Sequence, residues 1–272
     1  MMASSKINYA WRLFATGISF LLFAVGGAIL SFSTLAYLKL KRSPKNQKAM
    51  IMRKAISNTF RLYIGFLKLC RLLTYEIQGL EKLQKQGQLI LVNHPTLLDV
   101  VFVMSLIDRA DCVVKSNLWK SALTRGPVNA ADYISNGSEQ LIMDCVNSLK
   151  AGNTLIIFPE GTRTIPGTPI KFHRGASNIA LMAEKNITPI LIDCKPLTLR
   201  KTDKWYHIPE RAPHFCIKVL DDVSIEDILH SDHLQSKKAR QLNSRLQTFF
   251  MSRLTEHFGI EFPALTKTPS KT

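Results

Sequence analysis

The stretch Leu91-Val92-Asn93-His94-Pro95-Thr96-Leu97-Leu98-Asp99 closes an apolar run and then turns polar within two residues. That run is short and rich in Leu, Ile and Val, which predicts a buried β-strand. Pro95 pushes His94 out of helical backbone, and Thr96 is a residue type that often caps the start of a helix. The stretch therefore predicts a strand, a short loop that carries His94, and a helix whose first turn contains Asp99.

The same alternation of short apolar runs and helical stretches continues to residue 258. Apolar runs predict five strands, at 88–92, 112–115, 154–158, 188–194 and 215–220. Helical periods predict helices at 138–150, 175–185 and 233–258. Strands that alternate with helices predict an α/β fold with a mixed, largely parallel sheet flanked by helices. Ligands of such sheets bind beyond the carboxyl ends of the strands.

A second polar stretch, Phe158-Pro159-Glu160-Gly161-Thr162-Arg163, begins where another predicted strand ends. Gly161 allows the backbone to approach a ligand closely. The guanidinium of Arg163 can bind an anionic oxygen through two of its N–H groups, and Glu160 can hold the loop or Arg163 in place. Because both polar stretches follow predicted parallel strands, we expect them at the same edge of the sheet.

His94 and Asp99 are a candidate base and the carboxylate that orients it. Side chains five residues apart on one helix point about 140° apart, so contact requires His94 to precede the helix. Asp99 would then fix the imidazole tautomer, and the other ring nitrogen would take a proton from a hydroxyl group. The alternative is structural, because Thr96-x-x-Asp99 resembles a capping box. The sequence has no G-x-S-x-G motif, which disfavours a covalent nucleophile.

The first 48 residues are typical of a membrane anchor. No charged residue occurs from Leu13 to Leu38, a stretch of 26 residues, and a helix needs roughly 20 to cross a bilayer. The positive-inside rule then places the following domain on the cytoplasmic face, which is the inner membrane in a bacterium. A re-entrant hairpin bent at Gly26-Gly27 is the alternative to a single span. The basic flank consists of Lys39, Lys41, Arg42, Lys45 and Lys48.

Residues 51–75 carry apolar side chains at three- and four-residue intervals with cations between them. This pattern predicts an amphipathic helix on the membrane surface, and it also suits a helix that packs on the globular core. The expected organisation is an anchor at 1–48, an interfacial helix at 49–75, a globular domain at 76–262 and a loose polar tail at 263–272.

Composition narrows the class of partner. The chain has 272 residues, with 36 Lys+Arg against 20 Asp+Glu, and residues 1–78 hold 12 of these cations and one acid. A basic excess beside an apolar segment favours anionic lipid head groups. No zinc-finger or RNA-recognition pattern is present, so nucleic-acid binding is not expected. Five scattered cysteines without C-x-x-C spacing argue against disulfides and a structural metal, and no metal or cofactor is expected.

The two polar stretches, in this order, resemble the motifs of the glycerolipid acyltransferase family over roughly residues 76–220. The resemblance implies a membrane-bound enzyme that moves a fatty acyl group from a thioester to a lysophospholipid hydroxyl, foremost 1-acylglycerol 3-phosphate, giving phosphatidate. It implies His94 and Asp99 as catalytic residues. It also implies coenzyme A or an acidic acyl carrier protein as the acyl carrier, and membrane lipids as partners. The residues implied to bind substrate are Asn93, Glu160, Gly161, Thr162, Arg163, Lys171 and Arg174.

One departure from the family leaves the acceptor open. Members that act on lysophosphatidate usually carry an arginine after a short strand between the two polar stretches. Residues 130–137 read Ala-Ala-Asp-Tyr-Ile-Ser-Asn-Gly and contain no arginine. An amino-acid lipid, a glycolipid or a specialised lipid intermediate is therefore an alternative acceptor, and a catalytically silent lipid-binding protein is a further alternative.

Overall fold

The structure is a computed structural model that describes residues 2–40 and 44–263, with side chains described for 6–33 and 44–263. Lys41, Arg42 and residues 264–272 of the predicted tail lie outside the described residues. The elements in chain order are α1 Met2–Leu40, α2 Lys45–Leu69, β1 Thr74–Gln78, a 3₁₀ helix Leu80–Gln84, β2 Leu89–Val92, α3 Asp99–Leu106, β3 Asp111–Val114, a 3₁₀ helix Ser116–Trp119, α4 Arg125–Ala130, β4 Ile134–Ser135, α5 Leu141–Lys150, β5 Leu155–Ile157, α6 Gly175–Ala183, β6 Ile187–Lys195, β7 His214–Val219, α7 Glu226–Leu229 and α8 Gln235–Phe258.

The strands form one mixed sheet in the order β1-β7-β6-β2-β5-β3-β4. Every neighbouring pair is parallel except β6 and β7. The carboxyl ends of β6, β2, β5, β3 and β4 therefore meet at one edge. The predicted sheet class is confirmed, and each of the five predicted strands lies within one residue of its predicted bounds. The strands β1 and β4 were not predicted, because one is amphipathic and the other has only two residues.

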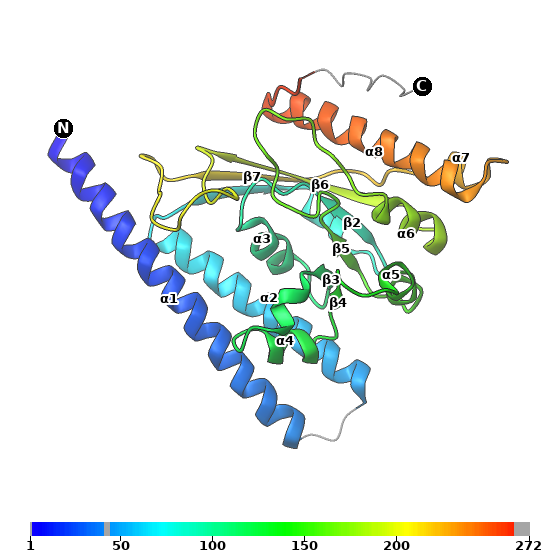
Figure 1. Cartoon of the computed structure of the whole chain (residues 1–272). Coiled ribbons are helices and arrows are strands. Elements are labelled where there is room, and N and C mark those ends of the chain that lie inside the picture. The colour runs from blue at the N-terminus through cyan, green and yellow to red at the C-terminus, as the bar shows by residue number, and fades with distance from the viewer. Residues whose placement is uncertain (1, 41–43, 264–272) are drawn as a thin grey trace.

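Helices cover both faces of the sheet (Figure 1). The helices α5, α6 and α8, predicted at 138–150, 175–185 and 233–258, pack on one face, and α2 and α3 pack on the other. The sequence of the central strand β2 is wholly apolar because both of its faces are buried. Ile90 and Val92 pack in the core on the side of α2 and α3, and Leu89 and Leu91 pack in the core on the other side. Strands buried on both faces read as continuous hydrophobic runs.

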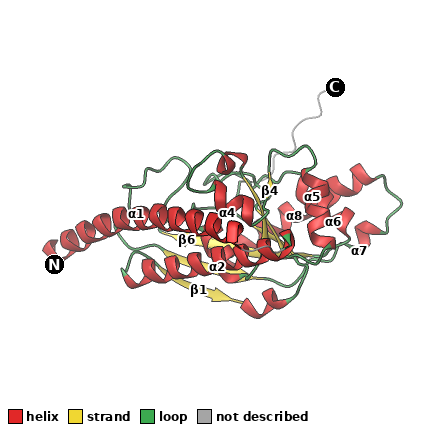
Figure 2. Ribbon diagram, turned by 90° about the horizontal axis from the view of Figure 1, so that it is seen from below, coloured by secondary structure: helices red, strands yellow, loops and turns green. Residues whose placement is uncertain are grey.

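The helix α1 is uninterrupted from Met2 to Leu40, so the hairpin bent at Gly26-Gly27 is wrong. Glycine permits a bend, but the helix continues through this pair. Its segment Lys6–Ser33 is long and apolar enough to cross a membrane and is mostly unburied. The helix runs along the globular domain (Figures 1 and 2). Its polar side chains Arg12 and Ser31 bond to that domain, and residues such as Phe14, Leu21 and Phe32 are exposed.

The helix α2 begins at Lys45 and ends at Leu69, so the predicted helix at 49–75 starts and ends too late. The chain turns after Leu69 because residues 74–78 pair with β7. Met52, Ile56 and Leu67 are buried in the core that contains α3, which confirms that the helix packs on the domain. Leu62 and Leu69 are exposed, so an apolar surface remains on its other side.

A buried ion pair fixes α2 to the sheet. Arg53 Nη2 lies 3.0 Å from Asp111 Oδ2, and both side chains are almost fully buried. Arg53→Ala would leave a buried carboxylate without its partner, so we expect the free energy of unfolding to fall by about 3–5 kcal/mol. Arg61 on the same helix pairs with Asp108 in a half-exposed contact, so Arg61→Ala is the matched control and should cost about 1 kcal/mol or less. Denaturant unfolding in detergent measures both, and equal losses would contradict the prediction.

Candidate active site

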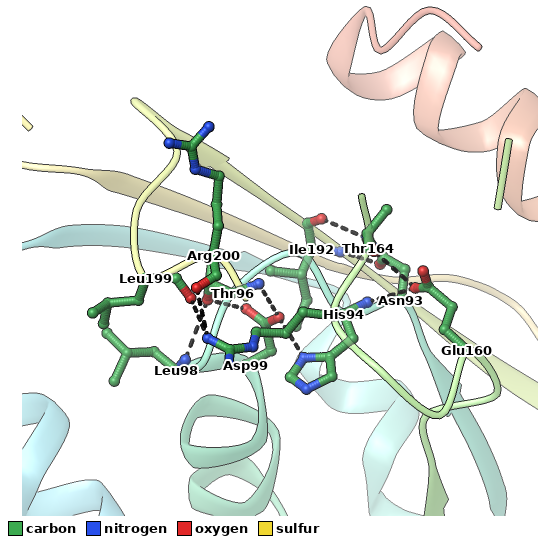
Figure 3. Close-up of polar contacts among 11 residues, drawn as sticks. Asn93, His94, Thr96, Leu98, Asp99, Glu160, Thr164, Ile192, Leu199 and Arg200 are labelled. Atoms are coloured by element: carbon green, nitrogen blue, oxygen red, sulfur yellow. Dashed lines mark hydrogen bonds and ion pairs between the residues drawn. The ribbon is translucent and has the colours of Figure 1, made fainter. Parts of the chain in front are cut away.

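His94 and Asp99 meet where β2 ends and α3 begins. His94 Nδ1 lies 2.9 Å from Asp99 Oδ2, as drawn in Figure 3. The Asp99 side chain is fully buried, whereas the His94 side chain is 15% exposed. Since the carboxylate occupies Nδ1, the neutral imidazole carries its proton there and Nε2 is the basic atom. This is the contact that the five-residue spacing and Pro95 predicted.

Thr96 holds the Asp99 carboxylate in place. Its backbone N–H donates to Asp99 Oδ2 at 2.7 Å and its hydroxyl donates to Oδ1 at 2.5 Å. Burial raises the pKa of Asp99, and hydrogen bonds from His94 and Thr96 oppose that rise. Thr96 Oγ1 also accepts from Leu98 N at 3.2 Å, as a capping hydroxyl does, although the regular helix begins only at Asp99. The expected capping of α3 by Thr96 is wrong, because the N-cap is Leu98 and it has no side-chain cap bond. The contacts of Thr96 instead form a turn before the helix, and the carboxylate of Asp99 serves both this turn and His94.

The two polar stretches are joined by hydrogen bonds that the sequence did not predict. Glu160 Oε1 accepts from the backbone N–H of His94 and from the hydroxyl of Thr164, each at 2.9 Å. Thr164 N in turn donates to His94 O at 2.7 Å. Burial raises the pKa of Glu160, and the hydrogen bond from the His94 N–H opposes this. Glu160 therefore fixes the backbone of His94, and with it the position of the imidazole (Figure 3).

Gly161 and Arg163 lie on the loop that follows β5. Gly161 has φ +65°, a backbone conformation that strains any larger residue, and a Cβ there would lie 3.0 Å from the His173 ring, which would have to shift. Arg163 Nη1 donates to the carbonyls of Leu199 and Arg200, both at 2.8 Å. These carbonyls belong to the connection between β6 and β7, which orients the guanidinium.

A cavity of about 770 Å³ opens beside His94, a size suited to a large small-molecule ligand. Apolar residues of α1, α2 and α3 form most of its wall. Within the described part of the chain, the cations that line it are Arg12, Lys115 and Arg163, and no carboxylate lines it. A mainly apolar cavity with fixed cations suits an amphiphile that has a negative head group.

Lys115 is a candidate site residue that the sequence analysis did not predict. Lys115 follows β3 and lines the same cavity as His94 and Arg163. The parallel register of Val114 with Ser135 places Lys115 beside Asn136, where the arginine usual in the family is absent. The sequence could have indicated Lys115, because a cation that directly follows a predicted parallel strand is expected at the same sheet edge as the two polar stretches.

Five of the predicted substrate-binding residues, Glu160 and four others, do not line the cavity. Both groups of the Asn93 amide are used by Ile192, with Nδ2 donating to its carbonyl and Oδ1 accepting from its N–H, each at 2.8 Å. Asn93 thus ties the end of β2 to β6. Thr162 is half-buried, and Lys171 and Arg174 are exposed on the surface.

A thiol at the cavity wall is not activated. Cys112 borders the cavity and is buried. Burial, together with the neighbouring Asp111, raises its pKa. Only a thiolate is a good nucleophile, so this environment does not favour an acyl-cysteine intermediate.

Known proteins resemble this chain in sequence and in fold. Residues 74–193 match the family model described as Acyltransferase. The chain is 28% identical over 145 residues to a 1-acyl-sn-glycerol-3-phosphate acyltransferase of Pseudomonas aeruginosa, covering 51% of this chain and 56% of that protein. It is 30% identical over 160 residues to the protein of the same name from Limnanthes alba, covering 55% and 56%. The chain thus spans just over half the length of these relatives.

The overall fold also has a solved counterpart. The structure of the 1-acyl-sn-glycerophosphate acyltransferase PlsC from Thermotoga maritima superposes with a TM-score of 0.65 at 18% identity, covering 89% of this chain and 97% of that one. At this identity the likeness concerns the fold, and it extends beyond the 74–193 region to most of the chain.

Proposed function

Because the chain belongs to the glycerolipid acyltransferase family, we propose that it transfers a fatty acyl group from a thioester to the hydroxyl of a lysophospholipid. The proposed acceptor is 1-acylglycerol 3-phosphate, and the product is then phosphatidate. The observation that carries the proposal is the pairing of His94 with a buried Asp99 at the wall of a cavity that is apolar and positively charged.

In the proposed reaction, His94 Nε2 removes the proton from the acceptor hydroxyl as its oxygen attacks the thioester carbonyl. The tetrahedral intermediate then collapses, the carbon–sulfur bond breaks, and the leaving thiolate takes the proton from the imidazolium. The carboxylate of Asp99 stabilises the imidazolium that forms between these steps. One ester bond forms as one thioester bond breaks, so the reaction needs no covalent enzyme intermediate and no metal.

The acceptor's phosphate is assigned to Arg163 and Lys115. Both are cations that line the cavity with His94. Lys115 directly follows β3, and Arg163 lies on the loop that follows the neighbouring strand β5. Within the described part of the chain, the hydrogen bonds of Arg163 involve only Nη1, which donates to the carbonyls of Leu199 and Arg200. Its other N–H groups can therefore bind phosphate oxygens, for which the guanidinium fork is well shaped.

The proposed location is a membrane surface. The exposed apolar face of α1 would contact lipid, and Lys45 and Lys48 beyond its end would lie near anionic head groups on the cytoplasmic side. A donor carried by coenzyme A or by an acidic acyl carrier protein would then approach from the cytoplasm. The strongly basic chain favours either of these anionic carriers.

A second acceptor class is supported by one observation, the absence of an arginine in residues 130–137. Asn136 stands at the end of β4 and lines the cavity, where its amide oxygen accepts from Ser116 N at 2.9 Å. A neutral residue at this position suits an acceptor without a terminal phosphate, such as an amino-acid lipid or a glycolipid. The choice between the two acceptor classes depends on whether Lys115 supplies the positive charge of the absent arginine.

The test is acyl transfer by the detergent-solubilised chain from a labelled acyl thioester to lysophosphatidate and to phosphate-free lyso-lipids. Lys115→Gln and Arg163→Gln are each expected to raise the KM for lysophosphatidate about tenfold or more, because each removes a charged hydrogen bond. Arg240→Gln, an exposed change on α8, is the matched control. Transfer only to phosphate-free acceptors, unaffected by Lys115→Gln, would reject lysophosphatidate and favour the second class.

A further inference from the structure

Arg12 is a charged residue buried on an otherwise apolar helix. It lies within the Lys6–Ser33 segment of α1, and its exposed fraction is 3%. Its guanidinium donates to the backbone carbonyls of Pro209, Glu210 and Arg211. The ion pairs recorded among the described residues include none to Arg12, so backbone carbonyls alone satisfy a charge that would be costly to bury unpaired.

The carbonyls that hold Arg12 belong to the same connection, residues 196–213 between β6 and β7, that holds Arg163. At its start, Leu199 O and Arg200 O accept from Arg163 Nη1. Leu199 O also accepts from Leu97 N at 3.2 Å, on the loop that follows His94. One connection therefore contacts α1 at one end and both polar stretches of the candidate site at the other.

The middle of this connection also rests on α1. The Trp205 ring lies against Phe20, with ring centroids 6.2 Å apart. It also covers Gly17, where an added Cβ would stand 3.5 Å from the ring. Trp205 and Ile208 line the cavity. The connection thus forms part of the cavity wall, and α1, which forms another part of that wall, holds it through a buried arginine and an aromatic contact.

We propose that Arg12 is a positioning residue for the acceptor site. By fixing the carbonyls of residues 209–211, it holds the β6–β7 connection so that Leu199 and Arg200 aim the guanidinium of Arg163 into the cavity. Docking of α1 on the domain would in this way set the affinity for the acceptor's phosphate. The part that concerns phosphate rests on the proposed function, whereas the part that concerns the connection does not.

An arginine is needed for this contact because of its geometry. Its planar guanidinium presents five N–H donors in a fixed fork, and here the fork spans three successive carbonyls. A lysine at position 12 would keep the charge but would offer a single ammonium group. Arg12→Lys is therefore expected to restore only part of what Arg12→Leu removes.

The chain offers a matched control on the same helix. Ser31 Oγ donates to Leu123 O at 2.6 Å, which attaches the far end of α1 to the domain without touching the β6–β7 connection. Ser31→Ala and Arg12→Leu each remove a polar contact between α1 and the domain. Only Arg12→Leu releases residues 209–211.

The experiment uses the full chain in detergent and compares steady-state kinetics with lysophosphatidate and with a phosphate-free lyso-lipid. Arg12→Leu is expected to raise the KM for lysophosphatidate about tenfold while kcat stays near the wild-type value. Arg12→Lys should lie between Arg12→Leu and the wild type, and Ser31→Ala should match the wild type. The proposal would be overturned if kcat fell with both acceptors in all three variants, because Arg12 would then have only a structural role.

A second readout separates this inference from the proposed function. Hydrogen–deuterium exchange of the amides in residues 197–213 should speed up in Arg12→Leu and remain at the wild-type rate in Ser31→Ala. Unchanged exchange in Arg12→Leu overturns the inference whatever the acceptor is. If the wild type does not use lysophosphatidate, the proposed acceptor is rejected, and the exchange rates still decide whether Arg12 holds the connection.

Discussion

His94→Ala is expected to lower kcat for acyl transfer by about 10²–10⁴-fold, the usual contribution of a positioned general base. The imidazole is held by Asp99 at 2.9 Å through Nδ1, which leaves Nε2 as the base in the cavity. Because His94 stands on a loop and is partly exposed, its removal should leave the fold intact. The measurement is transfer from a labelled acyl thioester, with the thermal unfolding midpoint recorded on the same sample.

The control for this change is a histidine away from the site. His233 is exposed shortly before α8, so His233→Ala should keep both activity and stability. Wild-type kcat in His94→Ala would exclude His94 as the base, and with it the mechanism proposed for either class of acceptor. A large loss of stability in His94→Ala would instead show that the imidazole matters for folding.

Asp99→Asn is expected to lower kcat by about 100-fold or more with little change in KM. The amide oxygen of asparagine can still accept from Thr96 N, which now donates to Asp99 Oδ2 at 2.7 Å, so the turn should form. The same amide oxygen can also accept from His94 Nδ1, so what is lost is the negative charge that stabilises the imidazolium. Steady-state kinetics beside the His94 variant measures the effect.

Asp108→Asn is the matched control for the carboxylate. Asp108 pairs with Arg61 in a half-exposed contact on the domain surface, so its kcat should equal that of the wild type. Because Asp99 and His94 would act as one unit, the double variant should be little worse than His94→Ala alone. Independent, multiplying losses in the double variant would contradict a shared role.

Much of the fold follows from local properties of the sequence. The strands within 88–92 and 154–158 are marked by apolar runs, and the polar residues that follow them mark the functional edge of a parallel sheet. The contact of His94 with Asp99 was also predictable, because the two residues are only five positions apart and Pro95 lies between them. Such features need no knowledge of how distant segments meet.

Other features depend on contacts between segments that are distant in the sequence. The sequence left open whether residues 51–75 lie on the membrane, pack on the core or do both. Only the packing of α2 against α3 showed that one side of the helix covers the core. Edge strand β1 and the two-residue strand β4 carry too little apolar pattern to be recognised alone. Their pairing with β7 and β3 defines them.

The sequence by itself determined the α/β class, the apolar first helix, and the residue types at the reacting centre. The tertiary structure alone decided which residues share the cavity. It joined Glu160 to His94 across 66 residues and Arg12 to Glu210 across 198, brought Lys115 into the cavity and left Lys171 and Arg174 outside it. The physical reason is that periodicity and strand ends are local properties, whereas a hydrogen bond between distant residues exists only once the sheet has formed and its loops are held at one edge.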